Sequence, residues 1–362
     1  METGYLIPVL HCHLPYVRHP EHEEFLEEDW FYEAVAETYL PLLHVFQDLL
    51  RDGVPFRVTL SVSPTLCEMM TNELLQQRCT RYLRRHVELA EREIERKRGT
   101  PFEATARLYR ESYGRALESW EHWDRSLVRA FRALRDEGCL ELIGSAATHA
   151  LLPLLGSEDA VRAQVRVGLE NFAKHFGRRP NGFWLPECAY RPGLEDVLAE
   201  FGIRYFFLDT HGLLLADPRP PHGVFAPLET PAGVLAFGRD VESSRQVWSA
   251  EEGMPGDPLY REFYRDLGYD AEEEYLRPYL PPGGERRYLG FKYHRITGDV
   301  PLDAKEPYDP EVARERAVEH AGEFVRQRTG QVVRARRAAG IPPAIVAPYD
   351  AELFGHWWFE GP

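Results

Sequence analysis

The chain has 362 residues, of which 44% are hydrophobic, and a formal net charge of −15. That length is enough for one large α/β barrel with insertions or for roughly two or three domains. The acidic balance argues against binding to nucleic acid or an anionic membrane surface, because both need a basic face. No apolar stretch approaches the ~18 residues of a membrane span, and no signal-peptide pattern precedes the first apolar run. We therefore expect a cytoplasmic protein with a neutral substrate and no nucleic-acid or membrane partner.

Seven short apolar runs predict the strands of the core. They span residues 5–10, 57–62, 140–145, 182–186, 204–208, 233–238 and 344–349. Continuous runs of this kind are typical of parallel strands that are buried on both faces. Helical patterns lie between them, at 31–51, 158–177, 193–202 and 310–339. This alternation predicts the α/β class, as a seven-stranded β/α barrel whose active site lies at the carboxyl ends of the strands.

Two segments interrupt the alternation. Residues 71–137 are rich in Arg, Glu, Leu and Ala and predict a hairpin of two long helices. Residues 241–290 are rich in Gly, Pro and Tyr and predict a long loop over the active-site face. The expected organisation is a catalytic barrel formed by residues 1–70 and 138–362, with a helical insertion at 71–137 and the loop at 241–290.

Two carboxylates come directly after predicted strands. Glu187 lies in WLPECAY (184–190) and Asp350 in APYDAELFGHWWFEGP (347–362). Cleavage of a glycosidic bond needs two such groups across one pocket, one as nucleophile and the other as acid and base. Each residue alone could instead be structural, Asp350 as a helix N-cap and Glu187 in a salt bridge. Their pairing, with aromatic residues beside both, favours catalysis.

A group of histidines leaves a second interpretation open. His11 and His13 follow the first predicted strand in HCHLPY, on one side of an extended chain, and His149 and His356 are further imidazoles. A His-x-His pair in this position also begins the metal site of amidohydrolase barrels, so a metal-dependent hydrolase is an alternative. A metal site would leave the pairing of Glu187 with Asp350 and the surplus of aromatic residues unexplained. The residues therefore favour a site without a metal.

Further candidates follow from charge and aromaticity. Glu141 lies within a predicted strand, where a buried carboxylate is tolerated only when it is functional or paired with an arginine. Arg239 follows the sixth run and could orient the nucleophile or neutralise it. Aromatic residues make up 12% of the chain, and the candidates for stacking on sugar rings are Trp30, Trp184, Trp248, Trp357 and Trp358.

Taken together, the motifs resemble glycoside hydrolase family 57, and within it the α-1,4-glucan branching enzymes. The resemblance extends over the whole chain and rests on four motifs in order: HCHLPY (11–16), ELIGSAATHALLPLL (141–155), WLPECAY (184–190) and YDAELFGHWWFEGP (349–362). It implies a seven-stranded β/α barrel and a retaining mechanism without a metal. Glu187 would be the nucleophile, and Asp350 the general acid and base.

The resemblance also implies a substrate and a binding surface. An α-1,4-glucan such as amylose or glycogen would be cleaved and transferred to a 6-hydroxyl group, creating an α-1,6 branch. A 4-α-glucanotransferase or α-amylase of the same family is the alternative, and a non-catalytic glucan-binding protein is a further one. The expected substrate-binding residues are His11, His13, Trp30, Glu141, His149, Trp184, Arg239, Trp248, Glu352, His356 and Trp357.

Two features depart from the family pattern. Many members begin the first motif with His-Gln-Pro, whereas this chain has His11-Cys12-His13, a variation associated with the branching subgroup. Branching enzymes of the family also continue past the fourth motif into a helical domain, whereas the sequence ends at Pro362. We therefore expect that domain to be absent from this chain. The motifs predict no oligomeric state.

Overall fold

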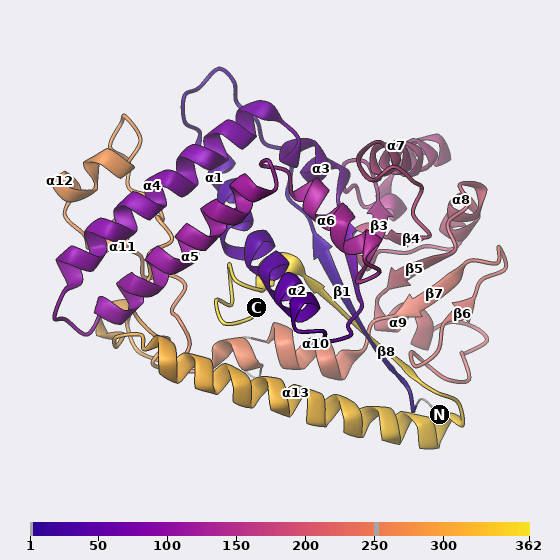
Figure 1. The fold of residues 1–362 in the computed structure, drawn as a ribbon. Coiled ribbons are helices and arrows are strands. Elements are labelled where there is room, and N and C mark those ends of the chain that lie inside the picture. The colour runs from indigo at the N-terminus through magenta and orange to yellow at the C-terminus, as the bar shows by residue number, and fades with distance from the viewer. Residues whose placement is uncertain (1–2, 250–252) are drawn as a thin grey trace.

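One curled sheet forms the centre of the molecule (Figure 1). The computed structural model describes residues 3–249 and 253–362. Its eight strands follow the order β6-β7-β5-β4-β3-β2-β1-β8. Seven are parallel: β1 (Tyr5–Cys12), β2 (Val58–Val62), β3 (Leu140–Ser145), β4 (Gly182–Trp184), β5 (Tyr205–Leu208), β7 (Leu235–Gly238) and β8 (Ala344–Asp350). The strand β6 (Leu228–Glu229) is antiparallel to β7.

The strand count differs from the expectation by one. Each of the seven apolar runs overlaps a parallel strand, but the sheet has eight strands because β6 adds an antiparallel edge. With only two residues, one of them charged, β6 produces no apolar run. One hydrogen bond joins the β7 margin of the sheet to the β8 margin. The amide of Asp240, just after β7, donates over 2.9 Å to the carbonyl of Val346 in β8. The two margins of the sheet therefore approach each other at this point.

The helices outside the insertion include α1 (Leu26–Glu33), α2 (Leu40–Arg51), α7 (Glu158–Phe176), α8 (Leu194–Glu200), α9 (Thr210–Leu214), α10 (Val241–Trp248) and α13 (Pro310–Ala339). Two of them, α7 and α13, begin and end at recognisable signals. The hydroxyl of Ser157 accepts from the amide of Ala160 at the start of α7, and Gly177 ends that helix in the left-handed conformation. Asp309 and Gly340 bound α13 in the same manner. These caps explain why both helices match their predicted ranges closely.

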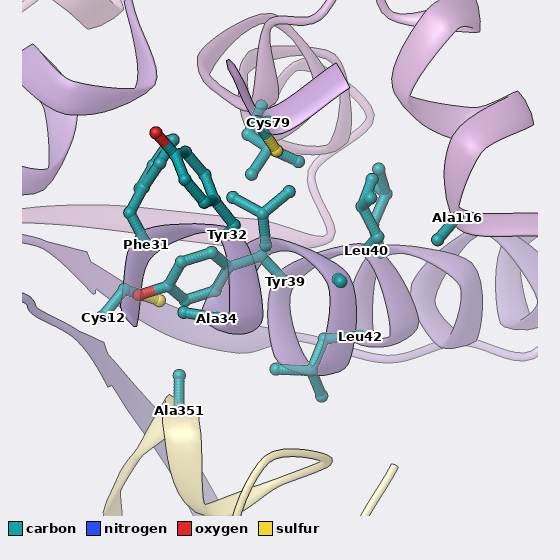
Figure 2. Packing of buried hydrophobic residues seen from close by; sticks show 14 of the residues in the cluster. Cys12, Phe31, Tyr32, Ala34, Tyr39, Leu40, Leu42, Cys79, Ala116 and Ala351 are labelled. Carbon is teal, nitrogen blue, oxygen red and sulfur yellow. The ribbon is translucent and has the colours of Figure 1, made fainter. Parts of the chain in front are cut away.

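A π-helical turn, Ala34–Tyr39, joins α1 to α2 and packs against the short 3-10 turn Ala351–Leu353 that follows β8. Its buried hydrophobic residues belong to the largest hydrophobic cluster. Figure 2 shows this packing, with the ring of Tyr39 directed toward Cys12 and with Ala351, just after β8, below the turn in this view. The turn therefore packs between the ends of the first and last strands and the helical insertion.

The insertion between β2 and β3 consists of helices. After the short α3 (Pro64–Met70) come α4 (Glu73–Lys97) and α5 (Glu103–His122), which lie side by side, and α6 (Leu127–Asp136) leads into β3 (Figure 1). Trp120 is buried between the two long helices, where its Nε1 donates to the hydroxyl of Thr80 over 2.9 Å. Among the described residues, no helix is long and apolar enough to cross a membrane.

Residues 241–290, where a long loop was expected, begin with α10 and contain the short helices α11 (Leu267–Asp270) and α12 (Glu273–Leu276). Residues 250–252 of this segment lie outside the described residues. Its later part packs on the helical insertion: the hydroxyl of Tyr275 donates to Glu93 over 2.7 Å, and that of Tyr279 donates to Glu88 over 3.0 Å. Of the described residues of this segment, only α10 and Ser249 line the larger cleft that is described below.

Candidate active site

Two clefts meet at the carboxyl ends of the parallel strands. The larger has a volume of about 820 Å³ and the smaller a volume of about 340 Å³. Both are lined by His11 from β1, Glu187 from the turn after β4, and Asp350 at the end of β8. The ends of parallel strands converge on one edge of a sheet, which brings together residues that are far apart in the sequence. The two carboxylates predicted to act on substrate therefore lie where the clefts join.

The other predicted site residues divide between the two clefts. The larger cleft contains Trp184, Arg239 and Trp248. The smaller one contains His13, Trp30, His149, Glu352, His356 and Trp357. Trp30 and Trp357 expose 47% and 49% of their surface, so their rings are available for stacking. Trp358, by contrast, is buried in the main hydrophobic cluster and is not available to a ligand.

Glu141 is the one predicted substrate-binding residue that lines neither cleft. It is the second residue of β3 and pairs in register with Thr59, whereas the end of β3 that faces the clefts is Ser145. The side chain of Glu141 is exposed, and it accepts a hydrogen bond of 2.6 Å from the hydroxyl of Tyr205. The expectation of a buried carboxylate near the cleavage point, or of one paired with an arginine, is therefore wrong. The strand begins one residue before Glu141, which places this residue at the end of the sheet opposite the clefts.

Glu187 projects from a strained turn. The strand β4 ends at Trp184, and Glu187 and Cys188 follow with φ angles of 57° and 53°. Each such left-handed residue other than glycine costs about 1–3 kcal/mol, and strain of this kind gathers at functional sites. The turn leaves 68% of the Glu187 side chain exposed, with its Oε1 at 3.9 Å from Nδ1 of His149. The carboxylate is therefore accessible to a ligand in either cleft.

Asp350 lies in a different environment from Glu187. It pairs with His11 in the parallel register of β1 and β8, at the floor of the junction. Burial, and then the negative charge of Glu187, raise the pKa of Asp350 to about 6, while the nearby Arg239 partly opposes this rise. A carboxyl group with this pKa retains a proton near neutral pH in a useful fraction of molecules, which suits a general acid.

Three imidazoles stack beside the carboxylates on the ring of Trp184. The ring centroids lie 4.6 Å apart for Trp184 and His11, 4.9 Å for His11 and His149, and 3.7 Å for His149 and His13. Burial is the main cause that lowers the pKa of all three histidines, to about 3 for His13 and about 4 for His149. The rings are therefore neutral, and each can present both a hydrogen-bond donor and an acceptor.

The geometry of these histidines also bears on the metal-site alternative. Nε2 of His11 and Nε2 of His149 are 2.8 Å apart, which is the length of a direct hydrogen bond. Within residues 3–249 and 253–362, no group of three His, Cys, Asp or Glu side chains is placed to hold a metal ion. The His-x-His motif is used here for stacking and hydrogen bonding.

Glu352 supports the floor of the smaller cleft. Its Oε1 accepts hydrogen bonds from the hydroxyl of Tyr39 and, over 3.2 Å, from the amide of His13. Burial outweighs these bonds and raises the pKa of Glu352 to about 8. Sequence reasoning missed Tyr39, because a tyrosine within a helical pattern carries no signal that it contacts the last motif.

The larger cleft contains polar residues that were not predicted. Asp209, His211 and Arg245 all line it. Oδ1 of Asp209 is 2.9 Å from Nδ1 of His211, and Oδ2 of Asp209 is 3.7 Å from Nη1 of Arg239. Asp209 directly follows the apolar run at 204–208, which is the same signal that identified Glu187. That signal could have found Asp209.

Comparison with known proteins defines the family. The sequence matches the family model of glycosyl hydrolase family 57 over residues 7–320. The chain therefore belongs to glycosyl hydrolase family 57. A 1,4-α-glucan branching enzyme of Thermococcus kodakarensis is 38% identical over 389 aligned residues, which cover 99% of this chain and 54% of that protein. A probable 1,4-α-glucan branching enzyme of Mycobacterium tuberculosis is 32% identical, with coverage of 99% of this chain and 66% of that protein.

Solved structures agree on the fold. The α-amylase AmyC of Thermotoga maritima superposes with a TM-score of 0.96 at 45% identity, covering 100% of this chain and 70% of that one. A branching enzyme of the same family from Pyrococcus horikoshii gives a TM-score of 0.87 at 37% identity, covering 99% and 65%. The chain spans about half the length of the Thermococcus relative and about two thirds of the Mycobacterium one.

Proposed function

We propose that the protein is a retaining enzyme acting on α-glucans, with Glu187 as nucleophile and Asp350 as general acid and base. The observation that carries this proposal is the contrast between the two carboxylates at the cleft junction. Glu187 is exposed on a strained turn, whereas Asp350 is held at the end of β8 with a pKa raised to about 6. Such a division of environments separates a nucleophile from an acid.

The reaction then proceeds in two steps. Asp350 donates its proton to the oxygen of an α-1,4-glucosidic bond while Glu187 attacks the anomeric carbon, forming a covalent glycosyl-enzyme. The departing glucan leaves with the proton, and Asp350 is left as a carboxylate. It next removes a proton from the 6-hydroxyl group of an acceptor glucan, which attacks the anomeric carbon and releases Glu187. The product carries a new α-1,6 branch.

We favour branching over the other activities because both relatives described above are named 1,4-α-glucan branching enzymes and align with 99% of this chain. The second candidate is hydrolysis, in which water takes the place of the acceptor. It is favoured by the 45% identity and the TM-score of 0.96 to the α-amylase AmyC. Transfer to a 4-hydroxyl group remains a third outcome of the same chemistry.

Product analysis on amylose distinguishes these activities. Branching predicts new α-1,6 signals in the proton NMR spectrum without a matching increase in reducing ends. New reducing ends without α-1,6 signals would refute branching and support the amylase. Glu187→Gln and Asp350→Asn should each lower turnover by several orders of magnitude while glucan binding is retained. If both variants keep an established activity, the assignment of catalytic residues is refuted.

The proposal extends to the rest of the site and to the organisation of the chain. The tryptophans and histidines of both clefts would bind the glucan, and no metal or organic cofactor would take part. We also propose that the seven parallel strands are the barrel proper, that residues 71–137 are its helical insertion, and that α10 shapes the acceptor side. A cytoplasmic location is part of the same proposal.

A further inference from the structure

A chain of hydroxyl groups lies behind His13. The helix α3 begins after Ser63, whose hydroxyl caps it by accepting from the amide of Leu66 over 3.4 Å. Oγ of Ser63 also lies 3.0 Å from Nδ1 of His13 and 3.1 Å from Oγ1 of Thr65. Thr65 in turn donates its hydroxyl proton to the carbonyl of Leu14 over 2.8 Å. These bonds connect the cleft wall to the start of α3.

Proton counting along this chain leaves one solution. The carbonyl of Leu14 can only accept, so it takes the single hydroxyl proton of Thr65. Thr65 must then accept in its bond with Ser63, which uses the single hydroxyl proton of Ser63. Ser63 has no proton left for His13, so Nδ1 of His13 must be the donor in their bond.

The neighbouring histidine provides a contrast. His11 makes the equivalent contact with Ser61 over 3.1 Å, because the parallel register pairs those two residues. The hydroxyl of Ser61 has no second partner within the described residues, so proton counting leaves the tautomer of His11 open. The constraint on His13 thus comes from Thr65 and not from the histidine–serine pair itself.

We propose that Thr65, acting through Ser63, holds His13 in the Nδ1–H tautomer, so that Nε2 accepts a hydrogen bond from a hydroxyl group of the bound glucan. His13 lines the smaller cleft, and its Nε2 makes no hydrogen bond to any described residue. A ring that is neutral and carries its proton on Nδ1 presents a lone pair at Nε2. Thr65 and Ser63 are positioning residues in this scheme, and the glucan as ligand rests on the proposed function.

The first test is the tautomer itself, which does not depend on the proposed function. Long-range ¹H–¹⁵N NMR of the whole chain labelled at histidine distinguishes a protonated Nδ1 from a protonated Nε2. The His13 signals are assigned by their loss in His13→Gln. We expect protonated Nδ1 in the wild-type protein. A protonated Nε2 would overturn the inference whatever the enzyme makes from amylose.

The second test uses matched variants at Thr65. Thr65→Val removes the acceptor of the Ser63 proton but leaves the Ser63 cap in place, so Ser63 can turn its proton toward His13. We expect a mixture of tautomers and a loss of roughly tenfold in kcat/KM on amylose. Thr65→Ser restores the hydroxyl and should restore both. Thr71→Val is the control, because Thr71 also donates its hydroxyl proton to a backbone carbonyl, that of Cys67 over 2.9 Å, at the end of α3 away from the clefts.

The outcomes separate the two proposals. An unchanged tautomer and unchanged kinetics in Thr65→Val would refute the role of Thr65. If this variant fails to fold, the wild-type spectrum and Thr65→Ser still decide the question. A wild-type protein with protonated Nδ1 but without activity on any α-glucan would refute the proposed function and leave the tautomer assignment standing.

Discussion

Replacing Asp350 by asparagine should stabilise the folded protein at neutral pH while abolishing its activity. The pKa of Asp350 is raised from 3.8 to about 6, first by burial and then by the charge of Glu187. At 1.36 kcal/mol per pH unit, this rise corresponds to about 3 kcal/mol in the free energy of unfolding. Asparagine has a similar shape and no charge, so it removes this cost without opening a cavity.

The pH dependence gives the sign of the effect. Because the folded state binds the Asp350 proton more tightly than the unfolded state does, protonation stabilises the fold. That stabilisation is fully present below the ordinary pKa of 3.8 and is lost as the pH rises through about 6. The advantage of Asp350→Asn over wild type should therefore be small near pH 4 and grow to at most about 3 kcal/mol near pH 7.5.

Urea denaturation of both proteins across this range measures the difference. Asp299 is an exposed aspartate that follows residues 241–290, so Asp299→Asn provides a control for the loss of one negative charge. An advantage of Asp350→Asn that is equal at acidic and neutral pH, or that Asp299→Asn reproduces, would show that the carboxyl group of Asp350 is not destabilised by its surroundings. The acid role would then lose its physical basis.

Three further predictions concern the site. Arg239→Met should raise the pKa of Asp350, because the positive charge of Arg239 lowers it, so the alkaline limb of the kcat/KM profile should move to higher pH; an unmoved limb would contradict this. Glu141→Gln should leave glucan activity unchanged, since Glu141 lies at the end of the sheet opposite the clefts; a large loss would restore it to the site. Dialysis against a chelator should leave activity unchanged, and a loss reversed by a divalent metal would revive the metal-dependent alternative.

Local patterns were sufficient for the seven parallel strands and for naming the two carboxylates as candidates. An apolar run that ends in a polar group marks both a buried parallel strand and its functional end, and this pattern is enough to identify Glu187 and Asp350 as candidates. Helix caps such as Ser157 and Asp309 likewise place the ends of α7 and α13 from sequence alone. These features depend on neighbours in the chain, so the sequence by itself determined them.

Other features depend on contacts between distant segments. Glu141 was mispredicted because the apolar residues around it indicated burial, whereas this second residue of β3 is exposed at the amino end of the strand. The bond from Tyr39 to Glu352 and the parallel register of His11 with Ser61 and Asp350 join segments that no local pattern connects. Tertiary structure alone decided them, because the register of the strands and the curl of the sheet determine which side chains meet.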